Sequence, residues 1–522
     1  MAKRATWVVA GAALVVVAAV VVLLESRSIY AGNIDLARHY QLVYWIEKHH
    51  TIPATPTPAL GEMAGYPPGA HIPAAIVGWI LRSPLLGLQV ITFLGVTAIW
   101  AAIGALLCMF PGFKRWSALS VMMVILVVTA EIGPLKVQLT GFEIIANFFY
   151  SQIVGEALFW LVAAFVVWGM RSDFSYRLLA WPTAVCALVC TEIHVVPAIQ
   201  LLVLLGIVSL RELIRRFRSD KDPGLTKYVF PVVLPAATAT LFLFSPGFRV
   251  MQQGSGSDGV LEVPYINGAL GAALLALVVL VVAAGLLAWS LRRPTSRPGA
   301  VVTSGICFIA ASIAIPCILQ FALLTLGGAG APYAVKKYVF GLFTVLALEL
   351  CALAAAATPV RLSASPEQPR QRSVLGIVGT VAAVGCVVVV SAWSLFDRPS
   401  ALQTMQTVAV ERQVGDYALL IGHVPGKQNY AFALPESPPT VDYMFSTTWL
   451  GVLPSQDSWT EGFPAFSSRT GFVLTTDGSI YGVPKCRVFG PQTRVVVVNG
   501  QCVKAALERR ARLAAAGSSG SP

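Results

Sequence analysis

The chain has 522 residues, of which 56% are hydrophobic and only 12% are charged, and its mean hydropathy is +0.73. Globular domains carry about 25% charged residues, so this composition excludes a water-soluble chain, an intrinsically disordered chain, a nucleic-acid-binding module and a disulfide-stapled secreted domain as descriptions of the whole. The chain has 37 basic and 25 acidic residues. What remains is a polytopic membrane protein, in which the positions of the basic residues in the loops must be known before the net charge indicates a partner.

Long apolar runs follow one another along the chain, and each can form a helix that crosses a hydrocarbon core about 30 Å thick. The fold class expected is an all-α polytopic membrane protein with about eleven transmembrane helices. The first run has no clean small-residue cleavage site after it, so we interpret it as a retained anchor. The predicted helices lie near residues 5–24, 85–109, 116–133, 154–170, 177–193, 194–210, 228–245, 266–290, 301–325, 337–357 and 374–395.

Basic residues predict the orientation, because cytoplasmic loops carry an excess of Lys and Arg. With a cytoplasmic amino terminus, clusters such as Lys114-Arg115 and Arg292-Arg293 fall in cytoplasmic junctions. We therefore expect a multi-pass plasma (inner) membrane protein whose residues 396–507 are extracytoplasmic.

The segment 25–84 is a long outer loop, and loops of this length are commonly functional. It contains Asp35, with Arg38 and His39 at i+3 and i+4 on the same helical face. A carboxylate at the membrane boundary with neighbours that tune its pKa can act as a general base. A helix N-cap or a first-turn ion pair explains the same pattern.

Later in the same loop, the segment Tyr66-Pro67-Pro68-Gly69-x-His71 leads into an amphipathic run that ends at Leu81. This run is too short to span the membrane comfortably. We expect it to lie along the outer interface, with Trp79 and Arg82 at the level of the lipid headgroups.

Other ionisable residues are predicted near the outer ends of the helices, where they are functional candidates because charge is costly at membrane depth. Ion pairs that hold the bundle together are the alternative. All histidines fall on the predicted outer side, but no His-x-x-x-His or Cys-x-x-Cys spacing identifies metal ligands. The candidates of this group are Glu131, Glu143, Glu156, Glu192 and His194.

The loop before the predicted helix 337–357 contains Tyr333, Lys336 and Lys337. Two adjacent lysines on the outer side oppose the positive-inside trend, and a phosphate would compensate their charge. Arg249, in the loop after residues 228–245, is a second candidate for the same anion. Ordinary anchoring of interface lysines at lipid headgroups is the alternative.

The tail differs in composition from the rest of the chain. Short strand-like runs at Tyr417–Ile421 and Arg494–Val498 predict a small β-rich extracytoplasmic domain. Cys486 and Cys502 both lie in it, and outside the membrane such a pair indicates a possible disulfide. Residues 508–522 are expected to be disordered.

No Walker loop, Rossmann fingerprint, HExxH or Gly-x-Ser-x-Gly motif occurs. The order of features, with Asp35 early in a long outer loop, the Tyr66-Pro67-Pro68-Gly69-x-His71 segment, many spans and a Tyr333-x-x-Lys336 element, resembles the GT-C superfamily of integral-membrane glycosyltransferases. The resemblance covers residues 1–395, which it identifies as the catalytic domain.

The resemblance implies inverting transfer of a sugar, such as arabinofuranose or mannose, from a polyprenyl-phosphate donor to an envelope glycan, lipid or protein at the outer face. It makes Asp35 the catalytic base and assigns Lys336, Lys337 and Arg249 to the donor phosphate. Many members have a paired acid where this chain has Leu36, which favours a monophosphate donor and no required cofactor. A divalent cation stays open, because Glu62, Glu131 or Glu143 could supply a second carboxylate.

Residues expected to line the acceptor and substrate region are Arg38, His39, Tyr66, His71, Glu131, Glu143, His194 and Tyr333. Membrane lipids are expected partners and nucleic acid is not. Two other classes stay open. A transporter or flippase of lipid-linked saccharides would be expected to show internal repeats with broken helices, and a non-catalytic scaffold of envelope assembly would tolerate loss of Asp35.

Overall fold

The computed structural model describes residues 34–53, 60–129, 135–219, 226–254, 261–292, 297–328 and 330–358. In the tail it describes residues 408–409, 411–412, 430–432, 441, 444–445, 448, 471–476, 482–489 and 495–518. The predicted helices 5–24 and 374–395, the strand-like run 417–421 and Glu131 lie outside these ranges.

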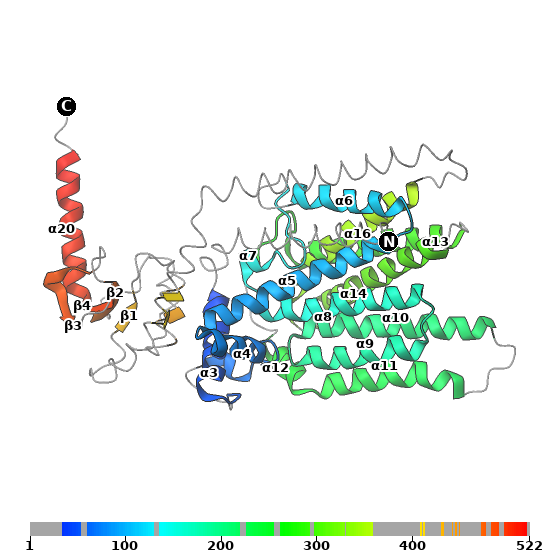
Figure 1. The fold of residues 1–522 in the computed structure, drawn as a ribbon, viewed down its shortest axis with the longest axis horizontal. Helices are drawn as coiled ribbons and strands as arrows, with labels where there is room; N and C mark the ends of the chain where they lie inside the picture. The colour runs from blue at the N-terminus through cyan, green and yellow to red at the C-terminus, as the bar shows by residue number, and fades with distance from the viewer. Residues whose placement is uncertain are drawn as a thin grey trace.

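The described part of the chain is a bundle of long apolar helices (Figure 1). All predicted helices between residues 85 and 357 are present, with ends shifted by a few residues. They are α5 (Pro84–Cys108), α6 (Lys114–Thr129), α8 (Tyr150–Arg171), α9 (Tyr176–Thr191), α10 (Val195–Ser219), α11 (Thr226–Phe244), α13 (Gly268–Arg292), α14 (Arg297–Gly327) and α16 (Val339–Ala357).

Within the described ranges, 6 helical segments are long and apolar enough to cross a membrane, and α9 and most of α11 form shorter apolar helices. The bundle also exposes large apolar side chains, including Leu241 and Phe244 on α11 and Leu277 and Val281 on α13. Large apolar side chains exposed in this number are unfavourable in water and suit contact with lipid. The structure is therefore that of a polytopic helical membrane protein, as the composition predicts.

Short helices gather at one end of the bundle, where the sequence predicts the outer loops. Helix α4 (His71–Leu81) is present where the sequence predicts a short helix. It packs so closely on α5 at Gly87 that a side chain there would not fit, because an ideal Cβ would lie 2.1 Å from the Ala74 carbonyl oxygen. The other short elements are α3 (Ile34–His49), η1 (Gly61–Gly65), α7 (Ile144–Asn147), α12 (Pro246–Gly254) and α15 (Pro332–Lys336).

The tail contains the predicted small sheet. Its strands are β1 (Tyr430–Phe432), β2 (Phe472–Thr476), β3 (Arg487–Phe489) and β4 (Val495–Asn499), in the order β1-β2-β4-β3. Strand β1 is parallel to β2, and the other pairs are antiparallel. A short 3-10 helix, η5 (Pro484–Cys486), precedes β3, and α20 (Gly500–Ser518) follows β4.

Two expectations for the tail have different outcomes. The Cys486–Cys502 disulfide is present and ties η5 to the first turn of α20. The expectation of disorder from residue 508 onward is wrong for 508–518, which α20 includes. Its Ala, Leu, Glu and Arg residues are strong helix formers, and the high content of small and charged residues that suggests disorder is equally compatible with an exposed helix.

Candidate active site

Helix α3 presents Asp35 to the interior of the protein. Its apolar face buries Leu36, Tyr40 and Val43 against the neighbouring helices α4 and α5, and this packing turns the first-turn carboxylate toward the bundle. Burial raises the pKa of Asp35, while the nearby positive charges of Lys337 and Arg38 act to lower it. A carboxylate with a raised pKa is a better proton acceptor than an exposed aspartate.

Lys337 reaches the same place from a distant part of the sequence, between α15 and α16. Its Nζ atom lies 4.6 Å from the centre of the Tyr333 ring and 5.1 Å from that of Phe149, distances at which an ammonium is attracted by an aromatic face. The Gln152 amide donates a hydrogen bond of 3.2 Å to the Lys337 carbonyl oxygen. A cation is thus held within electrostatic reach of Asp35.

Two tyrosines complete the surroundings of Asp35. The hydroxyls of Tyr66 and Tyr333 both interact electrostatically with its carboxylate, and the Ser151 side chain interacts with Tyr66. Tyr66 belongs to the loop after η1 and Tyr333 to α15. The acid therefore lies near two aromatic side chains that are far apart in the sequence but meet at the same end of the bundle.

Three buried histidines lie beside this acid and cation. His39 Nδ1 and His71 Nε2 are 2.8 Å apart, so one of the two rings donates and the other accepts. Burial lowers the pKa of all three, to about 3 for His71, and the positive charge of Lys337 lowers that of His39 and His194 further. At neutral pH the three imidazoles are therefore uncharged.

The tautomer of His194 follows from its backbone contact. Its Nδ1 accepts a hydrogen bond of 3.3 Å from the Val196 amide, so the neutral ring carries its proton on Nε2. His194 interacts electrostatically with both His39 and Lys337. The site thus has one ammonium close to a carboxylate and at least one neutral N–H donor within electrostatic reach of that ammonium.

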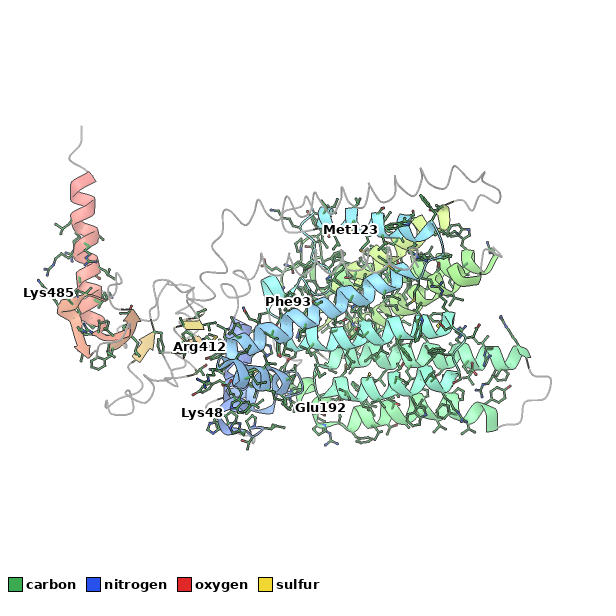
Figure 2. The ribbon with its side chains drawn as sticks, in the orientation of Figure 1. Lys48, Phe93, Met123, Glu192, Arg412 and Lys485 are labelled. Carbon is green, nitrogen blue, oxygen red and sulfur yellow. A yellow bond between two sulfur atoms is a disulfide. The ribbon has the colours of Figure 1, made fainter. Side chains whose placement is uncertain are left out.

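The loops that carry these side chains are fastened to one another. The Gly69 amide donates to the Glu192 carbonyl oxygen at 2.6 Å, and the Tyr150 hydroxyl donates to the Ala70 carbonyl oxygen at 2.6 Å. An ideal Cβ on Gly69 would lie 2.3 Å from the Glu192 oxygen, so only glycine permits this approach. These contacts set the positions of His71 and His194, at the end of the bundle where Figure 2 labels Glu192.

The other candidates predicted from the sequence lie elsewhere. Lys336 donates to the Leu261 carbonyl oxygen at 2.7 Å, and Arg249 has an exposed side chain on α12. Glu143 is fully buried, and burial, together with the neighbouring Glu156, raises its pKa to about 8. Of the residues assigned to the donor phosphate, Lys337 is the one that interacts with Asp35 in the structure.

Sequence reasoning missed the first turn of α8. Phe149, Ser151 and Gln152 contact Lys337 or Tyr66, although the helix was expected to begin near residue 154. The signal was present, because the polar pair Ser151-Gln152 and the following Glu156 lie on an otherwise apolar helix.

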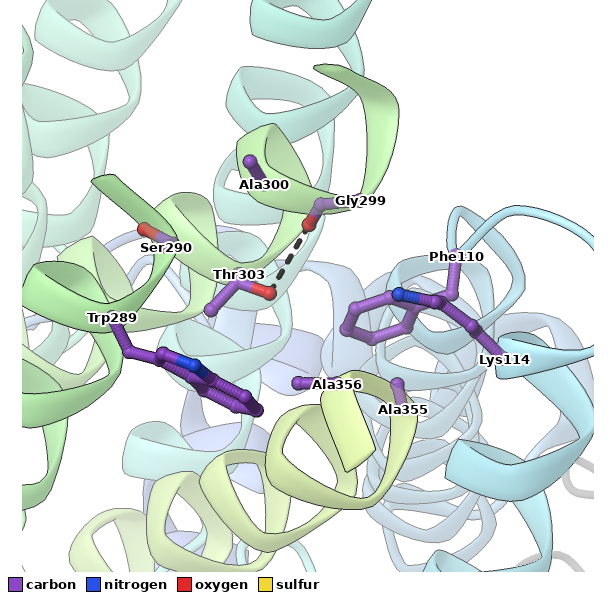
Figure 3. A pocket seen from close by; sticks show the side chains of 9 residues that line it. All are labelled: Phe110, Lys114, Trp289, Ser290, Gly299, Ala300, Thr303, Ala355 and Ala356. Carbon is purple, nitrogen blue, oxygen red and sulfur yellow. Dashed lines mark hydrogen bonds between the residues drawn. The ribbon is translucent and has the colours of Figure 1, made fainter. Parts of the chain in front are cut away.

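The described ranges contain no group of three His, Cys, Asp or Glu residues placed to hold a metal ion. A separate pocket lies at the other end of α16 (Figure 3), lined by Lys114, Trp289, Thr303, Ala355 and neighbouring residues. The pocket lies near the C-terminal end of α16, whereas Lys337 precedes the N-terminal end, and none of the site residues lines it.

No family model and no curated protein matches this sequence. Among solved structures, the chain matches the crystal structure of ArnT from Cupriavidus metallidurans bound to undecaprenyl phosphate, with 13% sequence identity and a TM-score of 0.37. The match covers 95% of this chain and 98% of that chain. At this identity and TM-score, the likeness assigns neither an activity nor a ligand to this chain.

Proposed function

We propose that the chain is an integral-membrane glycosyltransferase of the GT-C type, which moves a sugar from a polyprenyl-phosphate donor to a hydroxyl group of an envelope glycan, lipid or protein. One observation carries this proposal: a half-buried carboxylate, Asp35, lies within electrostatic reach of a half-buried ammonium, Lys337, at one end of a membrane-spanning bundle. Glycosyl transfer from a lipid phosphate needs a proton acceptor and a cation, because a hydroxyl loses its proton while a phosphate gains negative charge.

In the proposed reaction, Asp35 accepts the proton of the acceptor hydroxyl as its oxygen attacks the anomeric carbon. The bond from that carbon to the phosphate oxygen breaks on the opposite face, so the configuration inverts and the lipid phosphate leaves. Lys337 stabilises the charge on the leaving phosphate, and the Nε2–H group of His194 is a suitable second donor. Tyr66, Phe149 and Tyr333 offer aromatic faces to the sugar or the lipid.

Arg249 and Lys336 have a lesser role in this proposal. The exposed Arg249 suits the polar headgroup of a lipid approaching along α12. Lys336 stabilises the loop at Leu261 through its hydrogen bond to the backbone. Arabinofuranose and mannose are the first donors to test, and the extracytoplasmic side of the membrane is the proposed location of the site.

The test is transfer by purified protein in defined lipid, with polyprenyl-phosphate pentose and hexose donors. Asp35→Asn should lower the rate about 10²- to 10⁴-fold, because an amide cannot accept the proton, and it should leave membrane insertion intact. Asp173→Asn is the matched control, since Asp173 is exposed in the turn between α8 and α9. An Asp35→Asn variant as active as the Asp173→Asn variant would remove Asp35 from the mechanism.

A second outcome distinguishes the proposal from transport. If the parent protein produces no glycosylated acceptor from any of these donors but moves a labelled lipid-linked sugar between the leaflets of a vesicle, the chain is a transporter. If the parent protein shows neither sugar transfer nor movement of the lipid-linked sugar, the scaffold interpretation remains.

A further inference from the structure

A short piece of the tail is bonded to the corner where α4 meets α5. The Leu85 amide donates to Glu411 Oε1 at 3.1 Å, the Ser83 hydroxyl donates to Glu411 Oε2, and Arg412 donates to the Leu81 carbonyl oxygen at 2.9 Å. Val408 is buried in the main apolar core. Figure 2 labels Arg412 beside this corner. We call Val408, Glu411 and Arg412 the docking residues.

The docking residues also contact helix α3. The Tyr40 side chain interacts electrostatically with Glu411, and the carboxylate of Glu47 lies within electrostatic reach of Glu411. Further along the tail, the ring of Phe445 meets that of Tyr40 edge to face at 6.1 Å, and Phe432 packs on Phe445 at 5.8 Å. The described tail residues therefore contact the side of α3 that carries Tyr40 and Glu47, about 100° round the helix from Asp35 and His39.

Glu411 is an unusual residue for such a contact. It is 3% exposed, and its two oxygens already take part in hydrogen bonds to the start of α5. Its neighbour of like charge, Glu47, is itself partly buried, and the Oε2 atom of Glu47 has no hydrogen-bond partner. Two enclosed carboxylates repel each other when both are ionised. A structure that needed only a static cap for α5 would gain nothing from the second acid.

We propose that Glu411 is a positioning residue: by docking the tail on Ser83 and Leu85 it fixes helix α3, which carries Asp35 and His39, and the Glu47–Glu411 pair releases the tail as the pH rises. The proposal concerns the coupling of the tail to α3 and does not depend on the reaction that Asp35 performs.

The direction of the pH effect follows from the surroundings of the pair. Burial raises the pKa of both Glu47 and Glu411 to about 7 in the docked state, and the charge of Glu411 adds to the rise at Glu47. A raised carboxyl pKa stabilises docking fully below the ordinary pKa of 4.5, and this stabilisation is lost as the pH rises through 7. The groups that face the pair are Tyr40 from α3, Ser83 and the Leu85 amide from α5, and Arg412 from the tail itself.

The test is hydrogen exchange of the full chain in lipid nanodiscs, read over the amides of α3 and normalised to those of α13. Glu411→Ala should speed exchange in α3 at least about tenfold at pH 6, because the hydrogen bonds of Glu411 to the Ser83 hydroxyl and the Leu85 amide are lost. In the parent, the opening of α3 should increase by up to about tenfold per pH unit for each carboxyl that ionises, between pH 5 and 8.

Three further variants keep the test decisive. Glu411→Gln keeps the shape of the side chain and should keep docking while losing most of the pH dependence. Glu47→Gln removes the repulsion and should extend docking to higher pH. Glu508→Gln, which removes an exposed tail carboxylate paired with Arg512, should change nothing. Exchange in α3 that is the same in the Glu411→Ala variant as in the parent, or that is independent of pH in the parent, would overturn the proposal.

Discussion

Replacing Lys337 by alanine tests the acid–cation pair more sharply than any other change. The ammonium is the positive charge that the proposed mechanism places beside the leaving phosphate, and a charge-assisted contact is worth about 1.5–3 kcal/mol. Its loss in the transition state should lower the transfer rate roughly 10- to 150-fold. The variant also loses the contacts with Tyr333 and Phe149, so its stability must be measured alongside.

Lys336→Ala is the matched control, because the neighbouring lysine donates to the Leu261 carbonyl oxygen. Its loss should cost about 0.5–1.5 kcal/mol of stability and leave the rate per folded molecule nearly unchanged. Lys337→Arg keeps the charge and should retain part of the rate, since a guanidinium also stacks on aromatic rings.

The assay is single-turnover transfer from a polyprenyl-phosphate sugar in defined lipid, with the amount of folded protein determined for each variant. Equal losses in the Lys336→Ala and Lys337→Ala variants would refute the assignment of Lys337, because they would show a general effect of charge at the membrane surface. A Lys337→Ala variant that turns over like the parent would place the phosphate elsewhere.

Three more outcomes are expected. The transfer rate should fall at acidic pH as Asp35 becomes protonated, with an apparent pKa above 3.8. Lys337→Ala should move this fall to higher pH, because Lys337 lowers the pKa of Asp35. A pH profile that is identical in the parent and the variant would contradict the pairing. Gly69→Ala should cost about 1–3 kcal/mol of stability through its clash with the Glu192 carbonyl, whereas Gly206→Ala, which has open space, should be neutral in thermal melts. Cys486→Ser should destabilise the tail by about 3 kcal/mol, measured as accelerated proteolysis of residues 471–518 only, and an unchanged cleavage rate would show that the disulfide adds nothing.

The helices of the bundle were predictable because their signal is local. A run of apolar residues long enough to cross a bilayer specifies a helix whatever its neighbours do, and α5, α8 and α13 lie close to their predicted positions. Asp35, His39, His71 and His194 could be selected for a similar reason, since ionisable groups near helix ends in an apolar chain are rare. The Cys486–Cys502 pair followed from its position in the tail alone.

Where the prediction from sequence went wrong, the missing information was exposure or packing. Helix α20 continues through residues that looked disordered, because composition does not separate an exposed helix from a coil. The contact of Glu411 with the start of α5 joins residues far apart in the sequence, and no local pattern marks a carboxylate as the cap of a distant helix.

The two adjacent lysines show most directly what only the tertiary structure decided. The sequence determined that a cationic pair precedes a late membrane helix on the same side as Asp35, and it treated both residues alike. Successive residues of a helix point about 100° apart, so helical structure sends Lys336 toward the Leu261 carbonyl and Lys337 toward Asp35. Which of the two faces the acid depends on the rotation of α15 and α16 against α3 and α8, and that rotation is set by the packing of side chains distributed over the whole membrane domain.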